Sequence, residues 1–270
     1  MTVVRHRPAG VEPLELWDVV VDGVPLYLVP EGQQPTAIAE VVRQLMAGTA
    51  RRHRTPADPL PRRGVDSVVV AGGGAVVDVV NALAAIVPAS AASDPVWSGE
   101  RGGHAVVRAD GGDVDTCLVV DVGQTSIKRS WRGQRHRLPR DLQRIPLEVD
   151  ARAPAVRVPA RQETVVFLAG ALTVTPTPTS VVLALPCEID DRLRVAGCSY
   201  PWDDDDDGLI PALVSTAGLG HEVRVLVLND AELAAAGVAD ARTSDGAILV
   251  LTVGLGLGAA WLPRRAEQRG

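Results

Sequence analysis

The C-terminal half of the chain consists of short apolar runs separated by polar turns that often contain glycine. Apolar runs of about four to eight residues, bounded by turn signals, are typical of strands buried on both faces of a sheet. They predict strands at 117–122, 180–185, 223–228, 247–253 and 258–262. After the turn that follows the first of these, we expect a second strand at 126–131 and a third at 134–138. Apolar residues at helical spacing predict helices at 160–172, 207–217 and 230–237. A strand, a glycine-containing turn and a second strand therefore occur twice, at 117–131 and at 247–262.

The N-terminal half carries similar signals at wider spacing. In chain order they predict a loose leader at 1–13, a β-hairpin at 14–29, a helix at 36–47, a strand, glycine turn and helix at 65–87, and short strands near Val96 and at 105–108. Asp22-Gly23 lies at the centre of the hairpin and favours a type I′ turn. Thr36 is a candidate N-cap of the first helix, and Gly48 is a candidate C-cap. The alternation of strands with helices indicates an α/β fold.

The composition is that of a globular protein, with 270 residues of which 46% are hydrophobic and 22% charged. A net charge of −6 argues against a nucleic-acid partner. No apolar run reaches the roughly 20 residues that span a bilayer, and no secretory leader is visible, so we expect no membrane partner and a cytoplasmic protein. Cys117, Cys187 and Cys198 include no closely spaced pair, which predicts neither a disulfide framework nor a zinc site.

The segment Asp121–Lys128 (DVGQTSIK) places an acidic residue at the end of a buried strand, followed at once by a turn with glycine and hydroxyl groups. Such a turn offers backbone N–H groups to phosphate oxygens, while a carboxylate holds a hydrated Mg²⁺. An ordinary hairpin with a polar tip has the same pattern. Lys128 is the only lysine of the chain, a bias that a genome rich in arginine codons also explains.

Two further turns are rich in glycine. Thr252–Gly258 (TVGLGLG) joins the last two predicted strands, and Gly72-Gly73-Gly74 joins a predicted strand to a helix. Alternating glycines allow the backbone to approach a ligand closely, and a glycine turn before a helix suits a nucleotide near the helix N-terminus. The structural alternative for Thr252–Gly258 is a hairpin whose glycines relieve crowding between strands. For Gly72-Gly73-Gly74 it is an ordinary tight turn.

Asn229 and Asp230 end a predicted strand and begin a predicted helix. Ligands of open α/β sheets usually bind at the carboxyl ends of strands, so Asp230 is a candidate general base. The helix dipole favours the ionised carboxylate, which predicts a weak base. A plain N-cap is the alternative role for both residues. The five carboxylates Asp203–Asp207 repel one another and predict a solvated loop or helix start.

Four motifs together resemble the ROK (repressor/ORF/kinase) family of the sugar kinase/actin-like ATPase superfamily. DVGQTSIK is similar to the family's first phosphate loop, and LTVGLGLGAAW is similar to its second. VLVLNDAELAAAG is similar to the family motif Asn-Asp-Ala-x-x-Ala-Ala-x-Gly, and LALPCEIDDRLRVAGCSYPWDDDDDG to its substrate segment. All four follow the family order.

The remaining family pattern is out of order. The family carries a Gly-Gly-Gly adenosine turn after its second phosphate loop, whereas here a strand, Gly-Gly-Gly and helix at 68–87 precede the first loop. Residues 96–106 (VWSGERGGHAV) resemble the family's closing stretch, and the hairpin at 14–29 would supply the strands expected just after Leu262. A circular permutation accounts for this order. A shortened kinase-like lobe behind an unrelated leader is the alternative.

The resemblance implies a two-lobed actin-like/sugar kinase (ribonuclease H-like) fold with a central cleft, with lobes at 112–228 and at 1–111 plus 229–270. It implies an ATP-dependent kinase that uses Mg²⁺ and no zinc, acts on a small polyol (a sugar, modified sugar or cyclitol), and is compatible with a homodimer. Asp230 would be the catalytic base, and Asp121 would hold Mg²⁺ through water. The residues implied at the nucleotide and its phosphates are Gly72, Gly73, Gly74, Gly123, Gln124, Thr125, Lys128, Thr252, Gly254 and Gly256, and those at the polyol are Glu188, Ser199 and Asn229.

Departures from the family pattern keep other functions open. The hydroxyl of the second phosphate loop is displaced by one position, to Thr252. The family's Cys-rich zinc motif is absent, and with it the usual Glu and His contacts to hexose hydroxyls, so we expect a polyol other than glucose. A non-catalytic sugar or nucleotide sensor and an ATPase that assembles are the alternatives. The intact pair Asn229-Asp230 favours transfer to a small molecule over filament hydrolysis.

Overall fold

The computed structural model describes residues 1–270 except 54, 56, 58, 75, 152, 203–207, 255 and 268–270. The loop or helix start predicted at Asp203–Asp207 therefore lies outside the described residues. Strands and helices alternate along the chain, which confirms the α/β class. The chain divides into two compact units, each described by itself: Met1–Pro8 with Gly99–Leu233, and Ala9–Ser98 with Ala234–Gly270.

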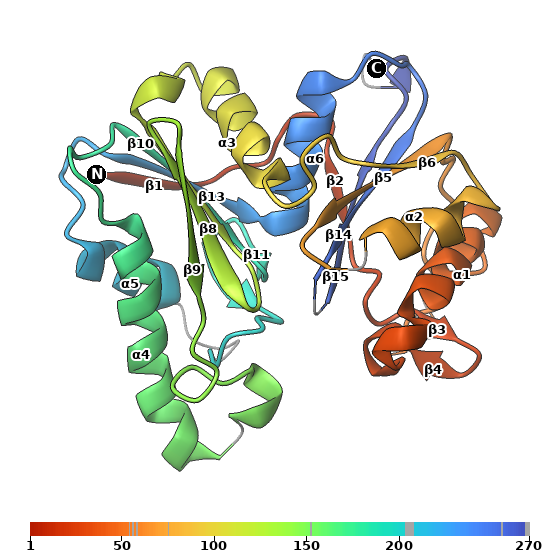
Figure 1. The fold of residues 1–270 in the computed structure, drawn as a ribbon, viewed down its shortest axis with the longest axis horizontal. Coiled ribbons are helices and arrows are strands. Elements are labelled where there is room, and N and C mark those ends of the chain that lie inside the picture. The colour runs from red at the N-terminus through yellow and green to blue at the C-terminus, as the bar shows by residue number, and fades with distance from the viewer. Residues whose placement is uncertain are drawn as a thin grey trace. The chain divides into compact units, whose positions relative to one another are not determined.

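The first unit is built on a six-stranded sheet (Figure 1). In sheet order its strands are β1 (Thr2–Arg5), β13 (Arg224–Asn229), β10 (Ser180–Leu185), β7 (Cys117–Val122), β8 (Ser126–Trp131) and β9 (Gln134–Pro139). β1, β13, β10 and β7 are parallel, while β7, β8 and β9 form an antiparallel meander. The carboxyl ends of the four parallel strands therefore meet at one edge of the sheet.

Helices cover both faces of this sheet. They are α3 (Ser98–Ala109), α4 (Pro154–Leu172), α5 (Leu209–Ala217) and the first turn of α6 (Asp230–Ala241), accompanied by 3₁₀ turns at Val114–Thr116 and Glu148–Asp150 and by a small hairpin of β11 (Glu188–Ile189) and β12 (Val195–Ala196). Successive side chains of a strand point to opposite faces. Accordingly, Val120 packs in one core with Leu168 of α4 and Leu209 of α5. Its neighbour Val119 lies against Gly103 of α3.

The second unit is built on a five-stranded sheet. In sheet order its strands are β2 (Glu12–Leu14), β15 (Leu257–Leu262), β14 (Ile248–Val253), β5 (Ser67–Gly72) and β6 (Ala89–Ala91). β14, β5 and β6 are parallel, while β14, β15 and β2 form an antiparallel meander. α1 (Gln34–Ala47) and α2 (Val76–Ala84) share one apolar core with β5 and β14. The N-terminal part adds β3 (Val20–Val21), β4 (Val24–Pro25) and 3₁₀ turns at Leu26–Leu28 and Glu31–Gln33.

The two sheets share one strand arrangement. In each, three antiparallel strands are continued by two strands that run parallel to the strand beside them. The sheet order is β9–β8–β7–β10–β13 in the first unit and β2–β15–β14–β5–β6 in the second. In the second sheet the last strand of the meander comes from near the start of the sequence, since Leu14 pairs with Ala259 and Glu12 with Trp261. The strand beside β15 is therefore β2. Its first two residues were predicted to belong to a leader at 1–13, and Leu14 to begin the hairpin at 14–29.

The strands and helices predicted in the C-terminal half are confirmed, although α4 begins earlier than predicted and α6 ends later. In the N-terminal half, β5, the glycine turn, α2 and α1 are confirmed. The C-cap of α1 at Gly48 is confirmed by a φ of 74°, but the predicted N-cap Thr36 is wrong because the helix already begins at Gln34. Asp22-Gly23 forms a turn with positive φ at both residues, but the hairpin around it is only as long as β3 and β4.

Two N-terminal predictions are wrong. Residues 1–13 are not a loose leader, because β1 and β2 lie there. The short strands predicted near Val96 and at 105–108 are also wrong: Val96 lies in the turn before α3, and 105–108 lies within α3. Its glycines lower helix propensity, but they permit close packing: a Cβ at Gly102 would come within 1.8 Å of the carbonyl oxygen of Leu233. Tertiary contacts therefore outweigh local propensity in this segment.

The predicted lobes at 112–228 and at 1–111 plus 229–270 differ from the two compact units in three places. β1 pairs with β13, α3 packs against β7, and Asn229 together with the first turn of α6 stays with the same sheet. These segments belong to the first unit.

Gly72 occupies a position where a side chain should be costly. Its φ is 108°, and a Cβ there would lie 2.2 Å from the carbonyl oxygen of Val253. Gly72→Ala should lower the free energy of unfolding by about 1–3 kcal/mol or more, since both the strained backbone and the backbone clash act against it. Gly73→Ala is the matched control, because no atom lies within 4 Å of its Cβ position. Urea unfolding measures both variants, and equal midpoints would contradict this account of Gly72.

Candidate functional site

Asp121 and Lys128 face each other across the first hairpin of the first unit. They are direct partners in the register of β7 and β8, and the Lys128 Nζ lies 2.9 Å from Oδ2 of Asp121. Both side chains are largely buried, with exposed fractions of 16% and 14%. Gly99, in the first turn of α3, lies against this carboxylate, since a Cβ there would be 2.8 Å from Oδ2. The sequence prediction thus places Asp121 correctly at a strand end, but α3 as its neighbour was missed.

Asp230 is the first residue of α6 and directly follows β13. Its pKa is raised to about 7, first by burial and next by the negative charge of Asp121. The backbone N–H of Ala231 and the charge of Lys128 act in the opposite direction. Asp121 therefore acts on Asp230 at the carboxyl edge of one sheet, where β10 lies between their strands.

The raised pKa overturns one expectation. The helix dipole alone predicted a weak base at Asp230, but desolvation and a like charge disfavour the ionised form more strongly than the helix start favours it. A carboxylate with a pKa near 7 accepts a proton at neutral pH far better than an ordinary aspartate does.

Asn229 makes three contacts that give it a capping role. Its Oδ1 accepts a hydrogen bond from the N–H of Ala231 at 2.9 Å, and its Nδ2 donates to the carbonyl of Cys187 at 2.9 Å. Its backbone N–H donates to Oε2 of Glu232 at 2.9 Å. The bond to Glu232, the third helical residue, is the return half of a capping box, while the Asn229 side chain caps the second helical residue; together they fix the start of α6 and with it the position of Asp230.

Glu232 is further held by Arg5, a residue that sequence reasoning missed. The guanidinium of Arg5 donates to both carboxylate oxygens at 2.7 Å, and the side chains are only 6% and 1% exposed. The spacing Asn-x-x-Glu was a usable signal for Glu232. No local pattern pointed to Arg5, because its partner lies at the opposite end of the sequence.

The turn between β7 and β8 carries the predicted residues Gly123, Gln124 and Thr125, and its carbonyl groups are held from two sides. Tyr200 donates its hydroxyl to the carbonyl of Gly123 at 2.9 Å. Arg140 donates from Nη1 to the carbonyl of Gln124 and from its backbone N–H to that of Thr125, both at 2.9 Å. Neither Tyr200 nor Arg140 was identified from the sequence.

Ser199 and Glu188, predicted at the polyol, lie on the segment between β10 and α5. Glu188 is exposed in β11. The Ser199 hydroxyl is buried and has no hydrogen-bond partner among the described residues. A disulfide joins Cys187 to Cys198 and closes this segment, so the prediction of no disulfide is wrong. The spacing of the two cysteines along the chain did not indicate this bond, because it is the small hairpin of β11 and β12 that brings them together.

The glycine turns of the second unit lie together. Gly72 pairs with Val253 at the ends of β5 and β14, and the N–H of Gly74 donates to the carbonyl of Val253 at 2.9 Å. The N–H of Gly254 donates to the carbonyl of Gly256 at 3.0 Å. The Thr252 hydroxyl is buried and has no hydrogen-bond partner within the described part of the chain. Such a hydroxyl is free to donate to a ligand oxygen.

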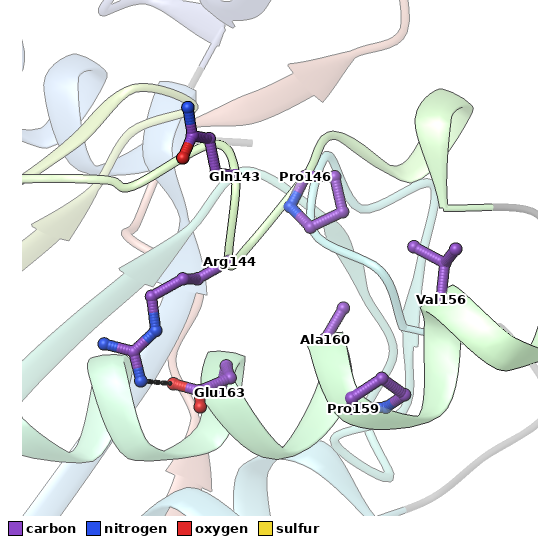
Figure 2. Close-up of a pocket in the computed structure, with 7 residues that line it drawn as sticks. All are labelled: Gln143, Arg144, Pro146, Val156, Pro159, Ala160 and Glu163. Carbon is purple, nitrogen blue, oxygen red and sulfur yellow. Dashed lines mark hydrogen bonds and ion pairs between the residues drawn. The ribbon is translucent and has the colours of Figure 1, made fainter.

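A separate pocket of about 270 Å³ lies between α4 and the loop before it (Figure 2). It is lined by Gln143, Arg144, Pro146, Val156, Pro159, Ala160 and Glu163. Arg144 and Glu163 form an ion pair at 2.7 Å. The pocket contains none of the predicted site residues.

Within the described ranges, no cluster of three or more His, Cys, Asp or Glu side chains could hold a metal ion. No helix among the described residues combines the length and apolarity needed to cross a bilayer.

Comparison with known proteins returned no match: no family model, no curated protein and no solved structure resembles this chain closely enough to be matched. Its function is therefore inferred from the residues and their geometry.

Proposed function

We propose that this protein is an ATP-dependent kinase that phosphorylates a hydroxyl group of a small polyol. The observation that carries the proposal is the pair Asp121 and Asp230. One carboxylate is held by Lys128, the other has a pKa of about 7, and both lie at the carboxyl edge of one parallel sheet segment. A pair of carboxylates with unequal environments is suited to divided roles, one as a base and one as an electrostatic anchor.

The proposed fold is a circularly permuted, two-lobed actin-like (ribonuclease H-like) fold with a central cleft. The shared strand arrangement of the two sheets supports it, as does the pairing of β2 with β15. A permutation requires that a strand from the start of the sequence continue the meander begun by the last two strands. That is the position of β2.

In the proposed reaction Asp230 acts as the general base. It accepts the proton of the polyol hydroxyl as the new oxygen–phosphorus bond forms and the bond from the γ-phosphorus to the bridging oxygen of ATP breaks. Phosphoryl transfer depends mainly on positioning and charge, so a base near pKa 7 assists without needing to ionise the hydroxyl beforehand.

The donor set near Asp121 fits Mg²⁺–ATP. Carboxylates are preferred ligands of Mg²⁺, usually with several waters retained, and a cation there would relieve the repulsion between Asp121 and Asp230. Asp121 would hold the ion through water, and Lys128 would face the phosphates. When bound, the ion neutralises charge on the transferred phosphoryl group.

Asp121→Asn should raise the KM for Mg²⁺–ATP about 10-fold or more, because the charge that attracts the cation is lost. It should also shift the acidic limb of the pH–rate profile to lower pH, since the neighbouring negative charge that raises the pKa of Asp230 is removed. Asp191→Asn, at an exposed ion pair, is the control. An unchanged KM for Mg²⁺–ATP with an unshifted profile would remove Asp121 from the site.

The proposal is tested by an ATP-consumption screen over sugars, cyclitols and nucleosides, with mass spectrometry of the product. A product heavier by one phosphate is the expected result. ATP binding without turnover of any acceptor would favour a sensor instead, and no ATP binding would reject the proposal.

A further inference from the structure

Arg140 follows the last residue of β9 and is almost fully buried, with an exposed fraction of 6%. Its guanidinium donates to the carbonyls of Ile145 at 2.8 Å, Gln124 at 2.9 Å and Ser199 at 3.2 Å, and also to that of Pro146. One side chain thus ties the β7–β8 turn to the loop before α4 and to the segment closed by the disulfide. Only a planar fork with several N–H donors can make such a set of contacts.

Tyr200 completes the support. Its ring lies under the guanidinium of Arg140, with 3.9 Å from Cζ to the ring centroid. Its hydroxyl donates to the carbonyl of Gly123 at 2.9 Å. Burial raises the pKa of this phenol to about 12, so the group remains a donor at neutral pH. The negative charge of Asp121 also acts on it, which places the phenol near the candidate site.

These contacts determine where the N–H groups of the turn point. In a planar trans peptide the carbonyl and the following N–H point in opposite directions. The carbonyls of Gly123 and Gln124 point toward Tyr200 and Arg140, so the N–H groups of Gln124 and Thr125 point away from them. Two successive N–H groups directed to one side form an anion-binding concavity.

We propose that Arg140 and Tyr200 are positioning residues that orient the N–H groups of Gln124 and Thr125 toward the phosphates of the bound nucleotide. This inference rests on the proposed kinase function and names the part of the site that recognises phosphate. Arg140 also adds a positive charge beside the turn. Neither residue transfers a proton or a phosphoryl group. Their effect is on nucleotide affinity through the orientation of the turn.

The experiment compares binding of ATP with binding of adenosine by calorimetry. Tyr200→Phe keeps the ring under Arg140 and removes only the hydroxyl donor. Arg140→Lys keeps the charge but has three donors on a single nitrogen, which cannot reach the four carbonyls that Nε, Nη1 and Nη2 of Arg140 contact. Both variants should bind ATP about 10-fold more weakly, or worse for Arg140→Lys, while the affinity for adenosine stays unchanged. Tyr27→Phe is the matched control, at the only other tyrosine, which is 45% exposed.

A purely structural role would reduce thermal stability and weaken both ligands equally, and that result would overturn the inference. Unchanged ATP affinity in a folded Tyr200→Phe variant would also overturn it. The outcome is separable from the kinase proposal. If the wild type binds ATP more tightly than adenosine but phosphorylates no acceptor, the kinase function fails while the role of the turn is still measured. If the wild type does not prefer ATP to adenosine, the inference fails whatever the turnover.

Discussion

Asp230→Asn should lower kcat by about 10²–10⁴-fold while the affinity for ATP remains nearly unchanged. The substitution keeps the size of the side chain and its ability to accept the hydrogen bond from Ala231, so α6 should still begin at the same place. It removes the group that accepts the proton of the polyol hydroxyl. Steady-state kinetics with the acceptor found by the screen, together with ATP binding by calorimetry, measure the two effects separately.

The pH dependence provides a second measurement on the same residue. Because the pKa of Asp230 in the free protein is raised to about 7, the wild-type kcat/KM, which reports the free enzyme, should increase as the pH rises through that value. The raised pKa also means that the folded state binds this proton more tightly than the unfolded state does. The stabilisation is therefore present at acidic pH and is lost as the pH rises through about 7.

Asp230→Asn should remove this loss and be more stable than the wild type at about pH 8. A plain N-terminal helix residue would show the opposite, since losing a negative charge at a helix N-terminus weakens the helix. Asp78→Asn, in the first turn of α2 and exposed, is the control for that helix effect. Near-normal turnover in folded Asp230→Asn would remove the central residue of the kinase proposal.

Arg5→Met should be the most destabilising of these substitutions, at about 3–5 kcal/mol in the free energy of unfolding. The pair of Arg5 and Glu232 is almost completely buried, and removing one partner leaves an uncompensated charge in the interior. Glu232 also receives the N–H of Asn229, so its disturbance reaches the start of α6. Urea unfolding at neutral pH measures the effect on stability. If kcat falls by more than the loss of folded protein explains, Asp230 has been displaced.

Arg7→Met is the matched control for Arg5→Met. Arg7 also pairs with a carboxylate, that of Asp191, but these side chains are 56% and 80% exposed. Exposed ion pairs contribute little, so we expect a change within about 1 kcal/mol. If the two substitutions lowered the free energy of unfolding equally, burial of the Arg5–Glu232 pair would not explain the effect of Arg5→Met.

Local sequence patterns were sufficient for the elements that bury continuous apolar runs. β10 was predicted with its observed ends, and β7 placed Asp121 at the edge of the sheet where it is found. Such predictions succeed because strand periodicity and turn residues act over a few neighbouring positions. The family resemblance also implied one lobe for the two glycine turns, and both lie in the second unit, where the strands that precede them pair.

What sequence reasoning missed depends on contacts between distant residues. α3 forms because its glycines fit against β7 and α6, which no local propensity records. The direction of the pKa shift at Asp230 depends on Asp121, which belongs to another strand. Arg140 and Tyr200 meet the turn at Gly123 and Gln124 only once the chain has folded. In each case the decisive partner lies outside any window that periodicity or capping rules can examine.

The pairing of β2 with β15 has a consequence for how the chain is made. During synthesis β2 is made more than two hundred residues before β15, so the second sheet stays incomplete until the chain has been made as far as Leu262. Until then the apolar strand β5 lacks its neighbour β14, and exposed strand edges of this kind promote aggregation. Pairings of such high sequence separation also fold slowly. Recombinant yield should therefore depend on slow translation or on chaperones that shield β5 while the chain is unfinished.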